Sequence, residues 1–211
     1  MRRLALRLVV AALALWAGAE TLEGRGVLAP PVLRHLRAMK DRDTPPPTCE
    51  DLALEAFPGL PVRRALAGYA PLERRGVRVE AYVRRIESSR DGDFHLKLVA
   101  SPSAGAGAHY VTAEITPRWR RGSPGWSLAR LAGALRAGHG DAAPPAKGPR
   151  RARLSGWLLY DVWCDALPAW VFDRGRRVNG WEIHPVTRLE VWDDSLARFV
   201  GLPRQPSTVT R

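Results

Sequence analysis

The chain has 211 residues, of which 45% are hydrophobic and 26% are charged. This composition is typical of a globular protein and excludes an intrinsically disordered chain, and the length suits one domain with extensions. No apolar run reaches the roughly 18 residues that a membrane span needs, so we expect no transmembrane span in the mature chain. The net charge is +12. The basic residues are almost all arginine, with lysine only at Lys40, Lys97 and Lys147. Because such an arginine excess is also typical of a GC-rich genome, the charge alone does not identify an anionic partner.

The first 19 residues have the order of a secretory signal peptide. Three arginines precede Leu8, an apolar stretch runs to Ala17, and Ala17-Gly18-Ala19 satisfies the small-residue rule for cleavage. We therefore predict that residues 1–19 are removed and that the protein is periplasmic or secreted. An uncleaved N-terminal anchor is the alternative.

Export affects how the two cysteines, Cys49 and Cys164, are interpreted. In an oxidising compartment, an isolated pair of cysteines is most simply a disulfide bond. We predict this bond, which would tie the N-terminal extension to the far end of the domain. Two unpaired buried thiols are the alternative.

The remaining chain divides into an extension, a domain and a tail. Residues 20–70 are expected to form an N-terminal extension with short helices at Val32–Lys40 and Cys49–Ala56. Residues 71–200 then carry five stretches in which polar and apolar residues alternate, which is typical of half-buried strands. These stretches cover residues 77–84, 94–98, 110–115, 152–159 and 181–191. A helix is expected at Trp126–Ala137, and residues 201–211 are expected to be a disordered tail.

Three strands, a helix and two further strands is the order of the OB-fold, a five-stranded Greek-key barrel. We therefore predict a mostly β chain with an OB-like barrel, one helix between strands three and four, and a helical N-terminal extension. The first strand loses its alternation near Arg85-Ile86, as a β-bulge would produce. A different small β-barrel or an α+β sandwich is the alternative.

Ionisable residues recur on the predicted strands, at Asp93, His95, Glu114, Glu182 and His184. A hairpin between the second and third strands places His95 nearly opposite Glu114, and the third strand of an OB barrel also neighbours the fifth. Two histidines and several carboxylates in one patch suit Zn²⁺ or a harder divalent ion. Such a patch could also supply a general base for hydrolysis.

If this patch is functional, we expect Asp93, His95, Glu182 and His184 to bind a divalent metal. Glu114, together with His95 and His184, would then be catalytic. All except Asp93 fall on the outward phase of their strands, where polar residues are normal. A solvent-facing role, with Glu–His pairs that stabilise the sheet, is therefore the alternative.

Four segments resemble a group of uncharacterised bacterial proteins that carry D-x-H, E-[IV], G-[WV]-x-x-[FY]-D and E-[IL]-H-P-V sequences. Here these segments are Asp93-Phe94-His95, Glu114-Ile115, residues 156–161 (GWLLYD) and residues 182–186 (EIHPV). The resemblance covers roughly residues 77–192. It implies a shared OB-like fold and a shared polar cluster, and it implies no particular activity.

Basic and aromatic residues also gather in two loops. Arg118, Trp119 and Arg120 follow the third strand, and Trp170, Arg174 and Arg177 lie in the long loop after the fourth. OB barrels bind ligands beside loops of this kind, and such residues can stack on bases and pair with phosphates. Because export argues against cytoplasmic nucleic acid, we expect an anionic envelope polymer or an envelope protein as the partner.

Two functions therefore remain open. The first is an exported OB-like binding or interaction module that uses the two loops. The second is a metal-assisted hydrolase, a phosphodiesterase or nuclease, that uses the polar cluster. An enzyme needs His95, Glu114, Glu182 and His184 within a few ångströms of one point, whereas a binding module does not.

Overall fold

The structure is a computed structural model that describes residues 30–62, 65–105, 107–121, 124–139, 148–166 and 176–202. The predicted signal peptide, most of the predicted tail, and the loop residues Trp170 and Arg174 lie outside these ranges. Within them, none of the helices is both long and apolar enough to cross a membrane.

The described residues contain one eight-stranded sheet in which parallel and antiparallel pairs are mixed. Its strands are β1 (Glu50–Asp51), β2 (Gly76–Ser88), β3 (Phe94–Val99), β4 (Tyr110–Ile115), β5 (Gly138–His139), β6 (Arg151–Tyr160), β7 (Arg177–Asp193) and β8 (Arg198–Gly201). The prediction of a mostly β chain is confirmed. Beyond the five predicted strands, the sheet also includes β1, β5 and β8, which have only two to four residues. Strands so short leave no alternating pattern in a sequence.

Hydrogen bonds link the five long strands in a closed ring, in the order β2–β3–β4–β7–β6 and back to β2. The β4–β7 pair is parallel, whereas the other pairs of the ring are antiparallel. A register shift between Val83 and Arg85 marks a bulge in β2, where the alternation of the sequence ends. His95 pairs with Glu114 across the β3–β4 hairpin, as predicted.

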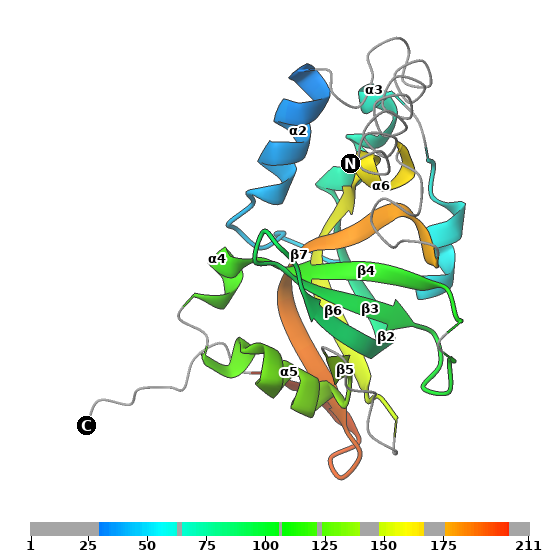
Figure 1. Cartoon of the computed structure of the whole chain (residues 1–211), viewed down its shortest axis with the longest axis vertical. Helices are drawn as coiled ribbons and strands as arrows, with labels where there is room; N and C mark the ends of the chain where they lie inside the picture. Colours follow the sequence, from blue (N-terminus) through cyan, green and yellow to red (C-terminus); the bar gives the residue numbers. More distant parts are fainter. Residues whose placement is uncertain are drawn as a thin grey trace, which may run out of the picture.

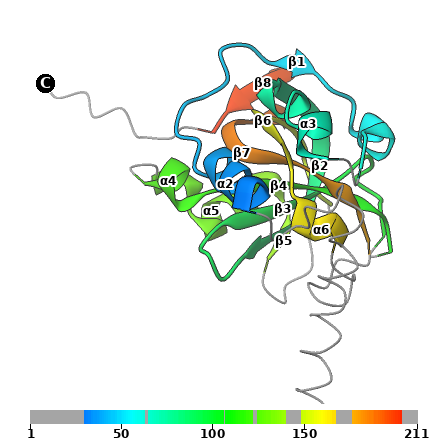
Figure 2. The ribbon, with the colours of Figure 1, turned by 90° about the horizontal axis from the view of Figure 1, so that it is seen from above.

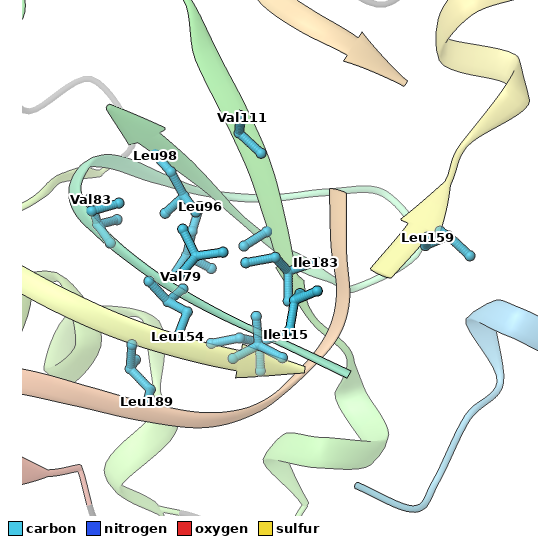
Figure 3. Close-up of a cluster of buried hydrophobic side chains, with 14 of the residues drawn as sticks. Val79, Val83, Leu96, Leu98, Val111, Ile115, Leu154, Leu159, Ile183 and Leu189 are labelled. Atoms are coloured by element: carbon cyan, nitrogen blue, oxygen red, sulfur yellow. The ribbon is translucent and has the colours of Figure 1, made fainter. Parts of the chain in front are cut away.

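The hydrophobic core lies inside this ring. Figure 3 shows buried apolar side chains that β2, β3, β4, β6 and β7 all contribute, among them Val79, Leu96, Ile115, Leu154 and Ile183. They come from every second residue of each strand because successive side chains point to opposite faces. Full burial of one such side chain stabilises a fold by about 1.5–3 kcal/mol. The apolar half of the alternating pattern is therefore explained by this core.

Short helices surround the sheet. They are α2 (Pro30–Lys40), α3 (Leu66–Tyr69), α4 (Pro117–Arg120), α5 (Leu128–Leu135) and α6 (Val162–Ala166), with 3₁₀ helices η1 (Leu54–Gly59), η2 (Leu72–Arg74) and η3 (Pro124–Trp126). The predicted helix at 126–137 is α5, which begins after the cap Ser127 and ends at Arg136 in the left-handed conformation. The predicted helix at 32–40 is α2, whereas the segment predicted as a helix at 49–56 contains β1 and the start of η1.

The N-terminal extension packs against one end of the sheet. In Figure 1, α2, α3 and α6 lie at this end and α5 lies at the other, and Figure 2 looks onto the end that α2 and α6 cover. The indole N–H groups of Trp157 and Trp181 donate to the carbonyl oxygens of Thr44 and Pro61, both at 2.8 Å. The extension is therefore bonded to β6 and to β7, the strand that carries Glu182 and His184.

Candidate functional site

The polar residues of β4 and β7 meet because these strands are parallel neighbours. Ala113 pairs with Ile183, so the next residues along the two strands, Glu114 and His184, lie side by side. Nδ1 of His184 is 2.9 Å from Oε2 of Glu114 and 3.3 Å from Oε1 of Glu182. The contact between the third and fifth long strands that the sequence predicts is thus present.

Two glycines allow neighbouring segments to approach this part of β7. A Cβ atom on Gly156 of β6 would lie 2.3 Å from the carbonyl oxygen of Pro185, and one on Gly180 would lie 2.7 Å from that of Asp161. Any side chain at either position would push β6 or the start of α6 away. Because glycine has no side chain, β6 and the start of α6 can pack directly against β7, the strand that carries His184.

The β3 segment adds two further residues, His95 within the strand and Asp93 immediately before it. Nε2 of His95 lies 3.3 Å from Oε1 of Glu114, and potential ligand atoms of Asp93, Glu114 and His184 all lie within 4.8 Å of one another. Donors at about 2.0–2.2 Å from one tetrahedral Zn²⁺ ion are about 3.3–3.6 Å apart. These three residues would therefore have to move closer together to share such an ion. Of the four predicted ligands, Asp93 and His184 belong to this set, while His95 and Glu182 flank it.

The cluster is buried, in contrast to the solvent-facing row that the strand phase predicts. Glu114, Glu182 and His184 are 2%, 0% and 0% exposed, and only His95 reaches the surface, with 35% of its side chain exposed. The expectation of solvent exposure was wrong because α2 and α6 pack against β7 and cover this face. Strand alternation separates two faces but does not show which helices cover them.

Several buried atoms of the cluster make no hydrogen bond to any described residue. They are both ring nitrogens of His184, Nε2 of His95, Oε2 of Glu114 and Oε1 of Glu182. All of these atoms except Nε2 of His184 lie at ion-pair distances from a partner in the cluster, but these contacts do not have the geometry of hydrogen bonds. A buried polar atom without a hydrogen bond costs about 1–3 kcal/mol.

Burial and pairing act in opposite directions on the pKa values of the cluster. Burial alone would raise the pKa of Glu114, but the adjacent His184 outweighs it and lowers that pKa to about 2. Burial also disfavours the charged form of His184, yet Glu114 and Glu182 raise its pKa to about 10. Asp93 differs, because burial raises its pKa to about 6. Without a metal, the protein atoms thus favour an ionised Glu114 beside a protonated His184, so an ion bound by His184 would have to displace a proton from its ring.

Arg177, a predicted ligand contact, instead uses its donors inside the protein. Its guanidinium donates to Oε2 of Glu182 at 2.6 Å, to the carbonyl oxygens of Asn179 and Gly180 at 2.9 and 3.3 Å, and to Sγ of Cys164 at 2.8 Å. Four of the five N–H donors of an arginine are therefore engaged, and only 8% of the side chain is exposed. Arg177 is a positioning residue for Glu182 in this structure.

A cavity of about 660 Å³ adjoins the cluster. Glu114 and His95 line it, together with Lys40 from α2, Lys97 from β3, and Asp161 and Trp163 at the start of α6. The volume lies in the range of small-molecule sites, about 300–1,000 Å³. Sequence reasoning missed Lys40 and Asp161, and the one available signal for Lys40 was the rarity of lysine.

Among the other predicted ligand contacts, Arg118 and Trp119 bond to the N-terminal extension, and Arg120 bonds to the segment between β2 and β3. Arg118 pairs with Asp43 at 2.6 Å, Trp119 donates to the carbonyl oxygen of Arg42 at 3.1 Å, and Arg120 donates to that of Gly92. A role of these residues in ligand binding stays a prediction.

The predicted disulfide was wrong, because no bond joins Cys49 and Cys164. Cys164 lies in the cavity, where Sγ accepts the hydrogen bond from Arg177. Cys49 lies in a different groove, beside Arg78 and Ser155. The two thiols thus lie in separate pockets. The number of cysteines in a sequence does not show whether two of them are close in space.

No protein-family model matches the chain, and no curated protein matches it. Among solved structures, asparaginyl-tRNA synthetase of Entamoeba histolytica is similar to 76% of this chain, with 12% sequence identity and a TM-score of 0.35. The chain spans 25% of the length of that synthetase chain. A likeness this distant carries no argument about function.

Proposed function

We propose that this chain is a metal-assisted hydrolase in which Asp93, Glu114 and His184 hold a divalent cation. One observation carries the proposal. The donor atoms of these buried residues lie within 4.8 Å of one another, and both ring nitrogens of His184 lack a hydrogen bond to the described residues. Carboxylate oxygen and imidazole nitrogen together suit ions such as Zn²⁺ and Mn²⁺.

A purely structural role explains the cluster less well. The side chains of Glu114, Glu182, His184 and Arg177 are all less than one-tenth exposed. Buried ion pairs are a weak source of stability, because the loss of hydration offsets the attraction between the charges. Apolar residues in this place would stabilise the fold equally well, so a chemical role is the better reason for charged ones.

His95 lines the cavity beside Glu114 and is the most exposed residue of the cluster, and we assign it the proton transfer. A water oxygen forms a bond to the ester centre of the substrate and gives its proton to the His95 ring. The bond to the leaving oxygen breaks, and this oxygen takes the proton from His95. Glu114, 3.3 Å away, stabilises the positive ring between these steps. When bound, the ion would acidify the water and polarise the ester.

We also propose that the ring of strands is an OB-like Greek-key barrel and that the chain is exported. The order β2–β3–β4–β7–β6, the parallel β4–β7 pair and the position of α5 between β4 and β6 support the fold. The basic, apolar and small-residue order of positions 1–19 supports export.

Thermal unfolding of the whole mature chain in EDTA and with Zn²⁺, Mn²⁺, Mg²⁺ or Ca²⁺ tests the site. We expect one of these ions to raise the Tm of the natural protein but not that of Asp93→Asn, which keeps the shape of the side chain and loses its charge. The matched control is Asp194→Asn, because Asp194 is exposed in the turn between β7 and β8 and does not line the cavity. If no ion raises the Tm, or if Asp93→Asn responds equally, the metal site is wrong.

Turnover is tested with p-nitrophenyl acetate, p-nitrophenyl phosphate and bis(p-nitrophenyl) phosphate. We expect hydrolysis of at least one ester that EDTA and Asp93→Asn both abolish. Metal binding without any such hydrolysis would contradict the proposed hydrolase activity and favour a binding module.

A further inference from the structure

Lysine is rare in this chain, and the structure places it at the cavity. Of the 33 basic residues only Lys40, Lys97 and Lys147 are lysines. Lys40 and Lys97 both line the cavity, and Lys147 lies outside the described residues. A lysine ammonium is a compact point charge on a flexible stem and is widely used to bind phosphate. The two exceptions to the arginine bias therefore point to a common role.

The N-terminal extension supplies the first of these lysines. Lys40 is the last residue of α2, a helix that is anchored by the buried side chains of Val32 and Leu36. Its Nζ lies 3.2 Å from Oδ2 of Asp161, and 31% of its side chain is exposed. An ammonium has three N–H donors, so the bond to Asp161 leaves donors that can reach a ligand in the cavity.

The strand β3 supplies the second. Lys97 is two residues from His95 and therefore on the same face of β3. Its Nζ lies 3.0 Å from Oε2 of Glu87 and 5.2 Å from the ring centroid of Tyr110. The carboxylate and the ring hold the ammonium on the wall of the cavity, in the row that continues from the proposed proton-transfer residue.

The charges of the described lining are balanced without a metal. The basic residues are Lys40, Arg90, Lys97 and Arg177, and the acidic residues are Glu87, Asp91, Glu114 and Asp161. The adjoining cluster adds the carboxylates of Asp93 and Glu182, so a divalent ion there would bring the site back to neutrality rather than to a net positive charge. Attraction for an anion therefore comes from the positive groups on the cavity wall. Because Arg177 is engaged inside the protein, these groups are the two lysines together with Arg90.

We propose that the cavity binds a phosphate ester, with Lys40 and Lys97 contacting the non-bridging oxygens of its phosphoryl group. This inference rests on the proposed function and names the substrate class of the same site. It also makes the N-terminal helix a part of the substrate-binding site, since Lys40 belongs to that helix.

Two measurements test the inference. The first is the affinity of the whole chain for inorganic phosphate, in EDTA and with the bound ion, by isothermal titration calorimetry. The second is KM for whichever p-nitrophenyl phosphate ester is hydrolysed. In Lys40→Gln and Lys97→Gln, we expect phosphate affinity to fall about tenfold each, as the loss of a hydrogen bond to a charged group predicts. KM should rise similarly, while the metal-dependent shift in Tm stays unchanged.

Two further variants control for charge and folding. Lys40→Arg keeps the charge and should retain most of the affinity, so it remains informative if Lys40→Gln does not fold. Arg151→Gln removes one positive charge from the exposed face of β6, where Arg151 pairs with Glu80, and should leave phosphate affinity unchanged.

The outcomes separate this inference from the proposed function. Unchanged phosphate affinity in the folded glutamine variants, an equal loss in Arg151→Gln, or no phosphate binding by the natural protein would each overturn the role of the lysines. Preference for the acetate ester would overturn the substrate class and leave the hydrolase intact. Phosphate binding that depends on both lysines in a chain that binds no metal would contradict the hydrolase alone.

Discussion

Two networks of charged side chains lie on different strands of this sheet and differ in their exposure to solvent. The first, Glu114, Glu182, His184 and Arg177, is buried. The second joins Glu80 of β2 to Arg151 and Arg153 of β6, and 35% of the Glu80 side chain is exposed. Water screens exposed pairs, which contribute about 0–1 kcal/mol each. Buried charges have lost their hydration, so each depends on its partners.

The comparison shows that the same alternating pattern produces two different kinds of surface. In the exposed network, Nη2 of Arg153 lies 2.6 Å from Glu80 and its guanidinium lies 3.9 Å from the centre of the Phe199 ring. These contacts are sufficient to account for the residues. In the buried network, atoms of Glu182 and His184 make no hydrogen bond to the described chain. Local pairing therefore accounts for the charges of the exposed network but not for those of the buried network.

Loss of one carboxylate from the buried network should have the largest effect. Glu182→Gln would leave the guanidinium of Arg177 buried without its negative partner, which typically costs about 3–5 kcal/mol. Urea unfolding of this variant and the natural protein measures the difference. A loss below about 1 kcal/mol, as at an exposed pair, would remove the contrast between the networks.

Metal binding should act on the buried network alone. An ion at about 100 times its Kd adds about 2.7 kcal/mol to the free energy of unfolding, or about 5–10 °C in Tm for a domain of this size. Differential scanning calorimetry should show this shift in the natural protein and in Glu80→Gln. EDTA should reverse it. A shift that Glu80→Gln reduces would place the ion elsewhere.

A methyl group at Gly156 should have an intermediate effect. In Gly156→Ala, the new Cβ would be 2.3 Å from the Pro185 carbonyl oxygen, so β6 must move from the segment that carries His184. Overpacking of this kind costs about 1–3 kcal/mol. Urea unfolding measures the cost, and Gly59→Ala, which meets nothing within 4 Å, is the control. Equal stabilities would show that β6 tolerates the side chain.

Removal of a charge from the exposed network should change stability least. Glu80→Gln removes the charge that pairs with Arg151 and Arg153, and we expect a loss of no more than about 1 kcal/mol in urea unfolding. High salt should reduce even this difference, because salt screens exposed charges. A loss of about 3 kcal/mol or more, of the size set by burial, would mean that exposure does not distinguish the two networks.

The sequence allowed the long strands to be predicted because each buries one face in the core. The pairing of His95 with Glu114 followed from the hairpin, and the meeting of Glu114 with His184 followed from the expected strand order. Both depend only on strand phase and connectivity, which a sequence displays directly.

The burial of the cluster could not be predicted in this way. It depends on α2 and α6, which lie far apart in the chain and meet β7 only in the fold. The position of Lys40 depends on the same packing. The disulfide prediction relied on the compartment, which indicates whether a bond can persist but not whether two thiols meet.

The position of β7 late in the chain determines when the site can form during folding. This strand pairs with β4, β6 and β8 and carries Glu182 and His184, whereas Asp93 and Glu114 precede His184 by 91 and 70 residues. Contacts between such distant segments form slowly, and nearly the whole chain must be present before the cluster exists. If the chain is exported as we propose and crosses the membrane unfolded, the proposed ion would be acquired only at the destination, and the metal supply there would decide which ion is bound.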